Sequence, residues 1–139
     1  KDAGLDVDNG ILVDASLRTT DPNVLAIGDV AAHQHPIIGQ RIRVEHWQNA
    51  QSQGKAAARI LLGEELEYDE LPSFFSDQYD AGLEYFGYTG RGPTDVTVER
   101  TGDGLVAWWR RDGRLLAAGH VNQWGRSEEL KQQVADAFS

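Results

Sequence analysis

The stretch that decides the fold is Thr20-Asp21-Pro22-Asn23-Val24-Leu25-Ala26-Ile27-Gly28-Asp29. Residues 24–27 are a continuous apolar run that Gly28 and Asp29 stop, and this predicts a short strand buried on both faces, as in a parallel sheet. Open α/β sheets bind ligands where their strands end. There the Asp29 carboxylate can accept hydrogen bonds from sugar-like hydroxyls, and Gly28 allows a close approach. Taken alone, the pattern favours an ordinary Gly-Asp surface turn.

The segments on either side extend the α/β pattern. Residues 10–14 are expected to form a strand, whereas residues 31–43 are expected to be irregular because Pro36 and Gly39 interrupt them. A helix is predicted from about residue 45 to residue 62. Its close-packed face is expected to consist mostly of small residues, namely Ala50, Gly54, Ala57, Ala58 and Leu61.

The pattern changes to strands after Pro72. Residues 64–70 are acidic and flanked by proline, which makes them the best candidate for a domain boundary. The last segment, residues 127–138, is predicted to be an amphipathic helix with Ser127 as its N-cap. Two Asp-Gly pairs indicate hairpins. The five predicted strands cover residues 74–79, 83–88, 95–99, 105–111 and 115–121.

Three motifs in this order resemble the C-terminal part of the FAD-dependent pyridine-nucleotide oxidoreductases. The first has Thr20, Val24, Ala26, Gly28 and Asp29 at the positions of that family's flavin-binding strand. The other two, Glu45-x-Trp47-x-x-Ala50-x-x-Gln53-Gly54 and Pro72-x-Phe74-Phe75-Ser76-Asp77-Gln78-Tyr79, are similar to the subfamily of ferredoxin, putidaredoxin and rubredoxin reductases. One departure is Phe75, where relatives often have Trp.

The resemblance implies a fold in two parts. Residues 1–69 would be an α/β segment that ends a doubly wound FAD-binding domain. Residues 70–139 would be the α+β C-terminal domain of the reductase, an antiparallel sheet with a packed helix. The chain starts at Lys1, contains no Met and lacks G-x-G-x-x-G, so we expect a piece of a longer protein. Alone it should be inactive, and it could form a homo-oligomer or a swapped dimer.

The resemblance also implies a function. NAD(P)H would reduce FAD, and the electrons would pass to a ferredoxin-type iron–sulfur protein. The cofactor-binding residues would be Gly28, Asp29, Val30, Glu45, His46 and Trp47. Trp47 could equally be a core aromatic. No catalytic acid or base is required, since the hydride passes directly between rings. The alternative is a docking or dimerisation module of a larger flavoprotein.

Other candidate sites are weaker. His33-x-His35 could ligate a metal, but no further Cys or His cluster accompanies it, so a plain loop is the better interpretation and no metal is predicted. On a strand, Trp108 and Trp109 would face opposite sides. Arg100, Arg110, Arg111 and Arg114 could dock an acidic ferredoxin, although a solvated hairpin face explains them more simply.

Charge and composition exclude several classes of partner. The net charge of -9 makes nucleic acid and anionic membranes unfavourable partners. No apolar run reaches the roughly 18–20 residues that a membrane span needs, and no signal peptide is recognisable. The chain has no Cys, which excludes disulfides and thiolate metal sites here. We therefore expect a cytoplasmic protein.

Overall fold

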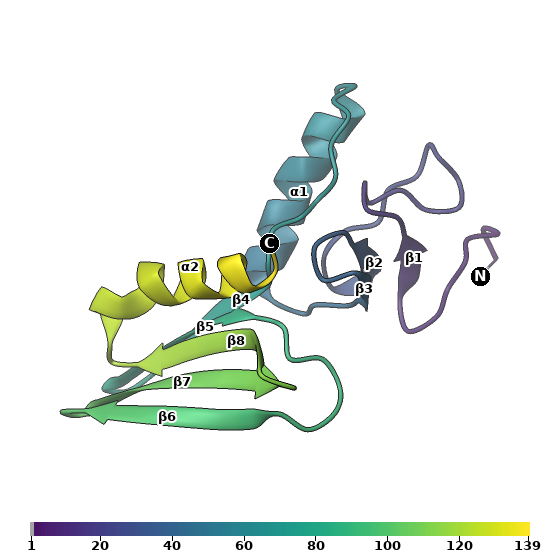
Figure 1. Cartoon of the computed structure of the whole chain (residues 1–139). Helices are drawn as coiled ribbons and strands as arrows, with labels where there is room; N and C mark the ends of the chain where they lie inside the picture. Colours follow the sequence, from purple (N-terminus) through teal and green to yellow (C-terminus); the bar gives the residue numbers. More distant parts are fainter. Residues whose placement is uncertain (1) are drawn as a thin grey trace. The chain divides into compact units, whose positions relative to one another are not determined.

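Three short strands form the first sheet in the computed structural model, which describes residues 2–139 (Figure 1). They are β1 (Ile11–Val13), β2 (Ala31–His35) and β3 (Gln40–Ile42), in the order β1-β2-β3. β1 runs parallel to β2, and β2 antiparallel to β3. The strand expected at residues 10–14 is confirmed by β1. The sheet belongs to the unit Lys1–Glu70, and the unit Leu71–Ser139 is described separately below.

The strand predicted over residues 24–27 is wrong. The segment bonds back to the loop that precedes it: the Thr19 amide donates to the Val24 carbonyl at 2.9 Å, and the Ala26 amide donates to the Leu17 carbonyl at 3.1 Å. Burial is also incomplete, because Val24 is 39% exposed while Ala26 is buried. The parallel pairing expected here is made instead by β1 and β2.

The irregular segment predicted at residues 31–43 is also corrected, because it forms the hairpin of β2 and β3. The two breakers lie in the turn between these strands. Gly39 has a φ of +73°, and its amide donates to the His35 carbonyl at 3.0 Å. Pro36 and Gly39 therefore end and restart the strands rather than preventing them.

The predicted helix is confirmed as α1 (Trp47–Leu61), and its predicted packing face is right in part, because Ala50 and Gly54 are half-buried against Gly28 and Ile27. Of the residues expected on that face, Ala57 is buried, whereas Ala58 and Leu61 are exposed. Most of the buried positions lie one residue earlier, and two of them are polar side chains with partners inside the unit. The buried set is Asn49, Gln53, Ala56, Ala57 and Ile60.

The second unit is a five-stranded antiparallel sheet with the order β4-β5-β8-β7-β6. Each predicted strand is present, within a few residues at its ends. The turn between β7 and β8 has positive φ at both Asp112 (51°) and Gly113 (80°), as a type I′ hairpin requires. The strands are β4 (Ser73–Gln78), β5 (Ala81–Gly87), β6 (Asp95–Thr101), β7 (Gly104–Arg111) and β8 (Arg114–Val121).

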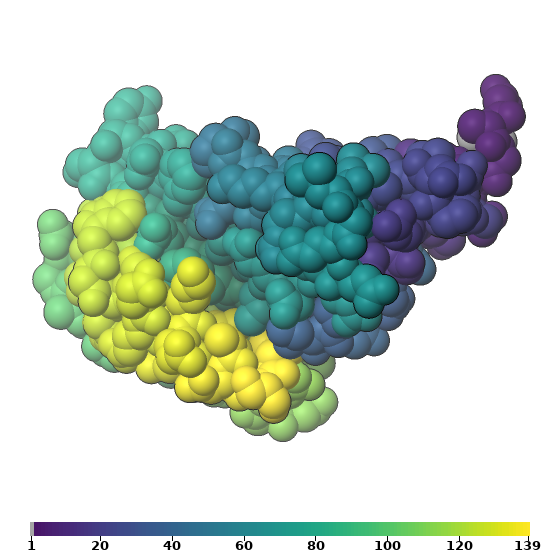
Figure 2. Space-filling model, turned by 90° about the horizontal axis from the view of Figure 1, so that it is seen from above, coloured from purple at the N-terminus to yellow at the C-terminus, as the bar shows by residue number. Residues whose placement is uncertain are grey.

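The final helix, α2 (Ser127–Ala137), lies across one face of this sheet (Figure 1). Leu130 and Val134 pack with Val106 and Ala118 in its core, as the apolar stripe predicts. The opposite face of α2 carries exposed polar side chains, and the helix lies at the surface in yellow in Figure 2. None of the helices formed by residues 2–139 has the length and hydropathy of a membrane span.

The predicted N-cap of α2 is wrong. The residue at that position is Arg126, and Ser127 is already helical. The Ser127 hydroxyl donates instead to the Glu84 carboxylate on β5, and it lies 2.9 Å from His120 Nε2 on β8. The hydroxyl therefore ties the helix start to the sheet rather than capping the helix.

Candidate functional site

The segment Gly28–Val30 forms the short 3-10 turn η1, which is fixed against α1. The Gly28 amide donates to the buried Oε1 of Gln53 at 2.7 Å. Gly28 has a φ of +70°, and a Cβ built there would lie 3.4 Å from the Cβ of Ala50. Glycine is therefore required here by the backbone conformation, whereas the space beside Ala50 would accept a Cβ at ordinary contact distance.

Arg43 connects η1 to the segment that leads into α1. Its Nη1 donates to the Asp29 carbonyl at 2.9 Å and to Glu45 Oε1 at 2.5 Å. The stem of Arg43 passes Gly10, where an added Cβ would lie 2.9 Å from the arginine Cδ and 2.7 Å from the Val30 carbonyl. The arginine thus holds two segments that are far apart in the sequence.

The start of α1 carries no side-chain cap and is preceded by the Arg43–Glu45 ion pair. His46 is the N-cap residue without a side-chain capping bond, and the first turn contains no acidic residue. The first N–H groups of a helix carry a partial positive charge and favour anionic or electron-rich groups. Trp47, the first helical residue, is 67% exposed, so it does not pack in the core of this unit.

The structure brings the six predicted site residues into one region of the first unit. Gly28, Asp29 and Val30 form η1, Glu45 is linked to it through Arg43, and His46 and Trp47 begin the helix. The expected place of Asp29 at the end of a sheet strand is corrected, because it lies in a 3-10 turn. Its side chain is nevertheless exposed while its backbone carbonyl is held.

Two residues that order the site, Arg43 and Gln53, carried no assigned role in the sequence interpretation. Both lie close to or within the quoted motif around Trp47. Their importance depends on contacts with Gly28 and Asp29, which residue spacing does not reveal. The available signals were the amide side chain of Gln53 among small residues of the predicted helix and the place of Arg43 two residues before that motif.

His33 and His35 lie on β2 rather than in a loop, and both are buried. Burial, followed by the neighbouring His35, lowers the pKa of His33 to about 4. Burial also lowers the pKa of His35, whose Nε2 donates to the Glu70 carbonyl at 3.2 Å while its Nδ1 accepts from the Ile38 amide at 3.2 Å. These contacts fit neutral core imidazoles. Residues 2–139 contain no cluster of three or more metal-ligating side chains.

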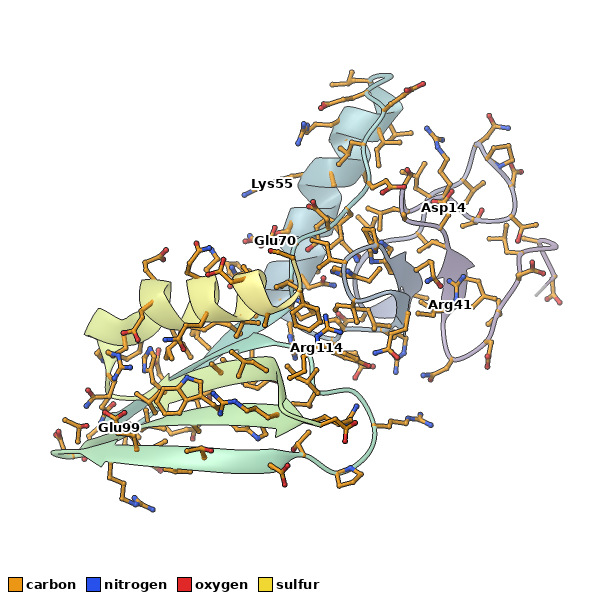
Figure 3. All side chains as sticks on the ribbon, viewed as in Figure 1. Asp14, Arg41, Lys55, Glu70, Glu99 and Arg114 are labelled. Carbon is orange, nitrogen blue, oxygen red and sulfur yellow. The ribbon has the colours of Figure 1, made fainter. Side chains whose placement is uncertain are left out.

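Two of the four arginines in the candidate docking patch have local partners. Arg111 donates to the carbonyls of Thr89 at 2.9 Å and Pro93 at 3.1 Å. Arg114, labelled in Figure 3, donates to the Ala137 carbonyl at 3.2 Å and lies over the Phe138 ring. These contacts order a loop and the end of α2.

The two tryptophans of β7 face opposite sides, as predicted from the strand. Trp108 donates to Gln133 Oε1 of α2 at 2.9 Å. Trp109 lies against Tyr85 on the other face, with ring centroids 5.4 Å apart. The second face also carries a hollow of about 280 Å³, lined by residues that include Phe74, Ala107 and Trp109.

Comparison with known families gives two matches along the chain. Residues 1–54 match the family described as pyridine nucleotide-disulphide oxidoreductase. Residues 73–137 match the family described as reductase C-terminal.

Curated relatives match over most of this chain. The ferredoxin–NAD(+) reductase component of the anthranilate 1,2-dioxygenase system of Burkholderia cepacia is 46% identical over 122 residues, which cover 86% of this chain and 30% of that protein. Putidaredoxin reductase of Pseudomonas putida is 32% identical over 135 residues, which cover 96% of this chain and 32% of that protein. The chain thus spans about a third of the length of these relatives.

Solved structures share the fold. A ferredoxin reductase from Rhodopseudomonas palustris matches with a TM-score of 0.84 at 35% identity, covering 91% of this chain and 32% of that one. A chain of the covalent putidaredoxin reductase–putidaredoxin complex matches with a TM-score of 0.83 at 31% identity, covering 99% and 32%. The chain therefore belongs to the FAD-dependent pyridine nucleotide-disulphide oxidoreductases, in the group of the ferredoxin reductases, and corresponds to a C-terminal portion of these proteins.

Proposed function

We propose that this chain supplies one side of the FAD site in a flavoprotein that oxidises NAD(P)H and reduces a ferredoxin-type iron–sulfur protein. The observation that carries the proposal is the meeting of Asp29 with the start of α1. Gln53 holds one side of η1 and Arg43 the other. An acceptor for hydroxyl groups and an array of free backbone donors are thereby placed in one region.

The donor and acceptor set fits a flavin. The flavin side chain carries hydroxyl groups, which the exposed Asp29 carboxylate can accept from. The ring becomes electron-rich at its pyrimidine end when reduced, and an uncapped helix start whose first turn has no acidic residue stabilises such charge. When bound, FAD supplies the chemistry of accepting a hydride and releasing its electrons singly.

Each residue of the site then has a distinct role. Asp29 binds the ribityl hydroxyls, with the Val30 backbone beside it. The first N–H groups of α1, near His46, would hold the pyrimidine side of the ring. Trp47 would be a stacking wall near the nicotinamide, and Glu45 would act through its partner Arg43. None of these residues needs to transfer a proton in the hydride step.

We further assign residues 1–69 to the end of the FAD-binding domain and residues 70–139 to the reductase C-terminal domain. The division of the chain into the units Lys1–Glu70 and Leu71–Ser139 supports this assignment, as do the two family matches. The names of the Burkholderia and Pseudomonas relatives support ferredoxin-type proteins as the electron acceptors.

The test is a visible absorption spectrum of the full-length protein that carries this chain. We expect flavin bands that NADH or NADPH bleaches under anaerobic conditions, followed by reduction of an added [2Fe–2S] ferredoxin. The chain expressed alone is the matched control and should show neither reaction. A colourless full-length protein that still forms a tight complex, with a ferredoxin or with itself, would instead support the alternative that the chain is a docking or dimerisation module.

A further inference from the structure

Arg43 occupies an unusual position between the two halves of the candidate site. Its guanidinium contacts a backbone carbonyl in η1 and the Glu45 carboxylate on the approach to α1. The Arg43 side chain is 28% exposed and that of Glu45 is 60% exposed. Its Nε is buried and has no hydrogen-bond partner within residues 2–139. The side chain is thus largely enclosed, with its charge directed at the site.

An ordinary exposed ion pair contributes little to a fold, but this one has a second connection. Because the same Nη1 binds Asp29 and Glu45, movement of the arginine shifts η1 relative to the helix start. The stem is also enclosed, since a side chain at Gly10 would collide with the Arg43 Cδ. A rigid, planar guanidinium suits this bridging geometry better than a flexible ammonium.

We propose that Arg43 is a positioning residue for the flavin site and that the Arg43–Glu45 pair sets its local charge. This inference rests on the proposed function, because it assigns the pair to the same site. Arg43 orients Asp29 through its carbonyl and balances the negative charge of Glu45. Removing Arg43 leaves the negative charge of Glu45 uncompensated beside the start of α1, and removing Glu45 leaves the positive charge of Arg43 uncompensated.

Opposite charges predict opposite changes in the flavin. Glu45 alone would disfavour electrons on the ring, so Arg43→Gln lowers the midpoint potential of the bound flavin. Arg43 alone would favour them, so Glu45→Gln raises that potential. The double variant should return close to the wild-type potential, because neither charge remains. A purely structural pair would not give shifts of opposite sign.

The experiment uses the full-length flavoprotein and measures both FAD dissociation and midpoint potential. We expect Arg43→Gln to weaken FAD binding about tenfold or more, because Asp29 loses its anchor. Arg43→Lys should keep the potential near the wild-type value while still weakening FAD binding, since the charge remains and the bridge is lost. Arg59→Gln is the matched control, because Arg59 forms an exposed ion pair with Glu64 at the far end of α1.

The outcomes separate this inference from the proposed function. Wild-type protein without flavin would contradict the proposed function itself. If the wild-type protein binds FAD and the Arg43 and Glu45 variants keep its affinity and midpoint potential, only the positioning role is overturned. Midpoint potentials that shift in the same direction in both variants would also overturn it. If Arg43→Gln does not fold, the raised potential of Glu45→Gln and the retained potential of Arg43→Lys still decide the matter, and an unchanged potential in Glu45→Gln would overturn the inference.

Discussion

At the scale of single residues, the buried side chain of Gln53 holds the backbone of η1. Its Oε1 accepts the Gly28 amide at 2.7 Å inside the unit. We predict that Gln53→Leu lowers the free energy of unfolding by about 1–3 kcal/mol, since a buried N–H loses its partner. Urea denaturation measures this value. Gln51→Leu is the control on the same helix, because Gln51 is exposed, and equal losses in both variants would contradict the assigned role.

A second prediction at this scale concerns acid stability. The pKa of His33 falls from 6.5 to about 4 in the folded chain, chiefly through burial. The unfolded chain therefore binds the proton first as the pH falls, so stability decreases between pH 6.5 and about pH 4 and levels off below that. His35 acts in the same direction.

Urea denaturation at several pH values tests the acid effect. A His33→Gln variant should lose less stability than the wild type between pH 7 and pH 5, because one titrating ring is absent. If the wild type has the same free energy of unfolding at pH 7 and at pH 5, the assignment of the histidines as neutral and buried is wrong.

At the scale of the elements, the hairpin between β7 and β8 depends on backbone conformation rather than on space. A Cβ at Gly113 or at Gly125 would meet nothing within 4 Å, but only Gly113 of the two has a positive φ, of 80°. Gly113→Ala should therefore destabilise the chain by about 1 kcal/mol, whereas Gly125→Ala should be neutral or slightly stabilising. Thermal unfolding compares the two variants, and indistinguishable melting temperatures would contradict the turn assignment.

The elements of the second unit could be predicted from the sequence because their signals are local. Alternating side chains and turn residues define each strand, and Leu130 and Val134 define the buried stripe of α2. The first unit was harder because its strands are short. Residues 24–27 are apolar like a buried strand but bond to the adjacent loop, and Pro36 and Gly39 close a hairpin instead of marking irregular chain.

The site residues could likewise be predicted from local motifs, whereas the contacts that connect them could not. The motifs placed Asp29 and the start of the Trp47 helix in one region, and the structure has this proximity. The connecting contacts of Arg43 and Gln53 span 14 and 25 positions in the sequence. Such contacts depend on tertiary packing, so no residue pattern could specify them.

At the scale of the whole molecule, exposed apolar side chains predict self-association of the chain on its own. Large apolar residues of the first unit are accessible, including Trp47 at 67% and Leu62 at 88%. We expect small-angle scattering of the isolated chain to report a dimer or larger species, and Leu62→Lys to shift it towards monomer. A compact wild-type monomer at high concentration would count against this prediction.

The central claim concerns Asp29 and is tested most directly by the FAD affinity of the full-length protein. Asp29→Ala removes the carboxylate that we assign to the flavin hydroxyls but keeps the backbone carbonyl that Arg43 binds. Fluorescence titration of the deflavinated protein with FAD should show affinity reduced about tenfold or more, with unchanged circular dichroism. Wild-type affinity in the Asp29→Ala variant would contradict the account.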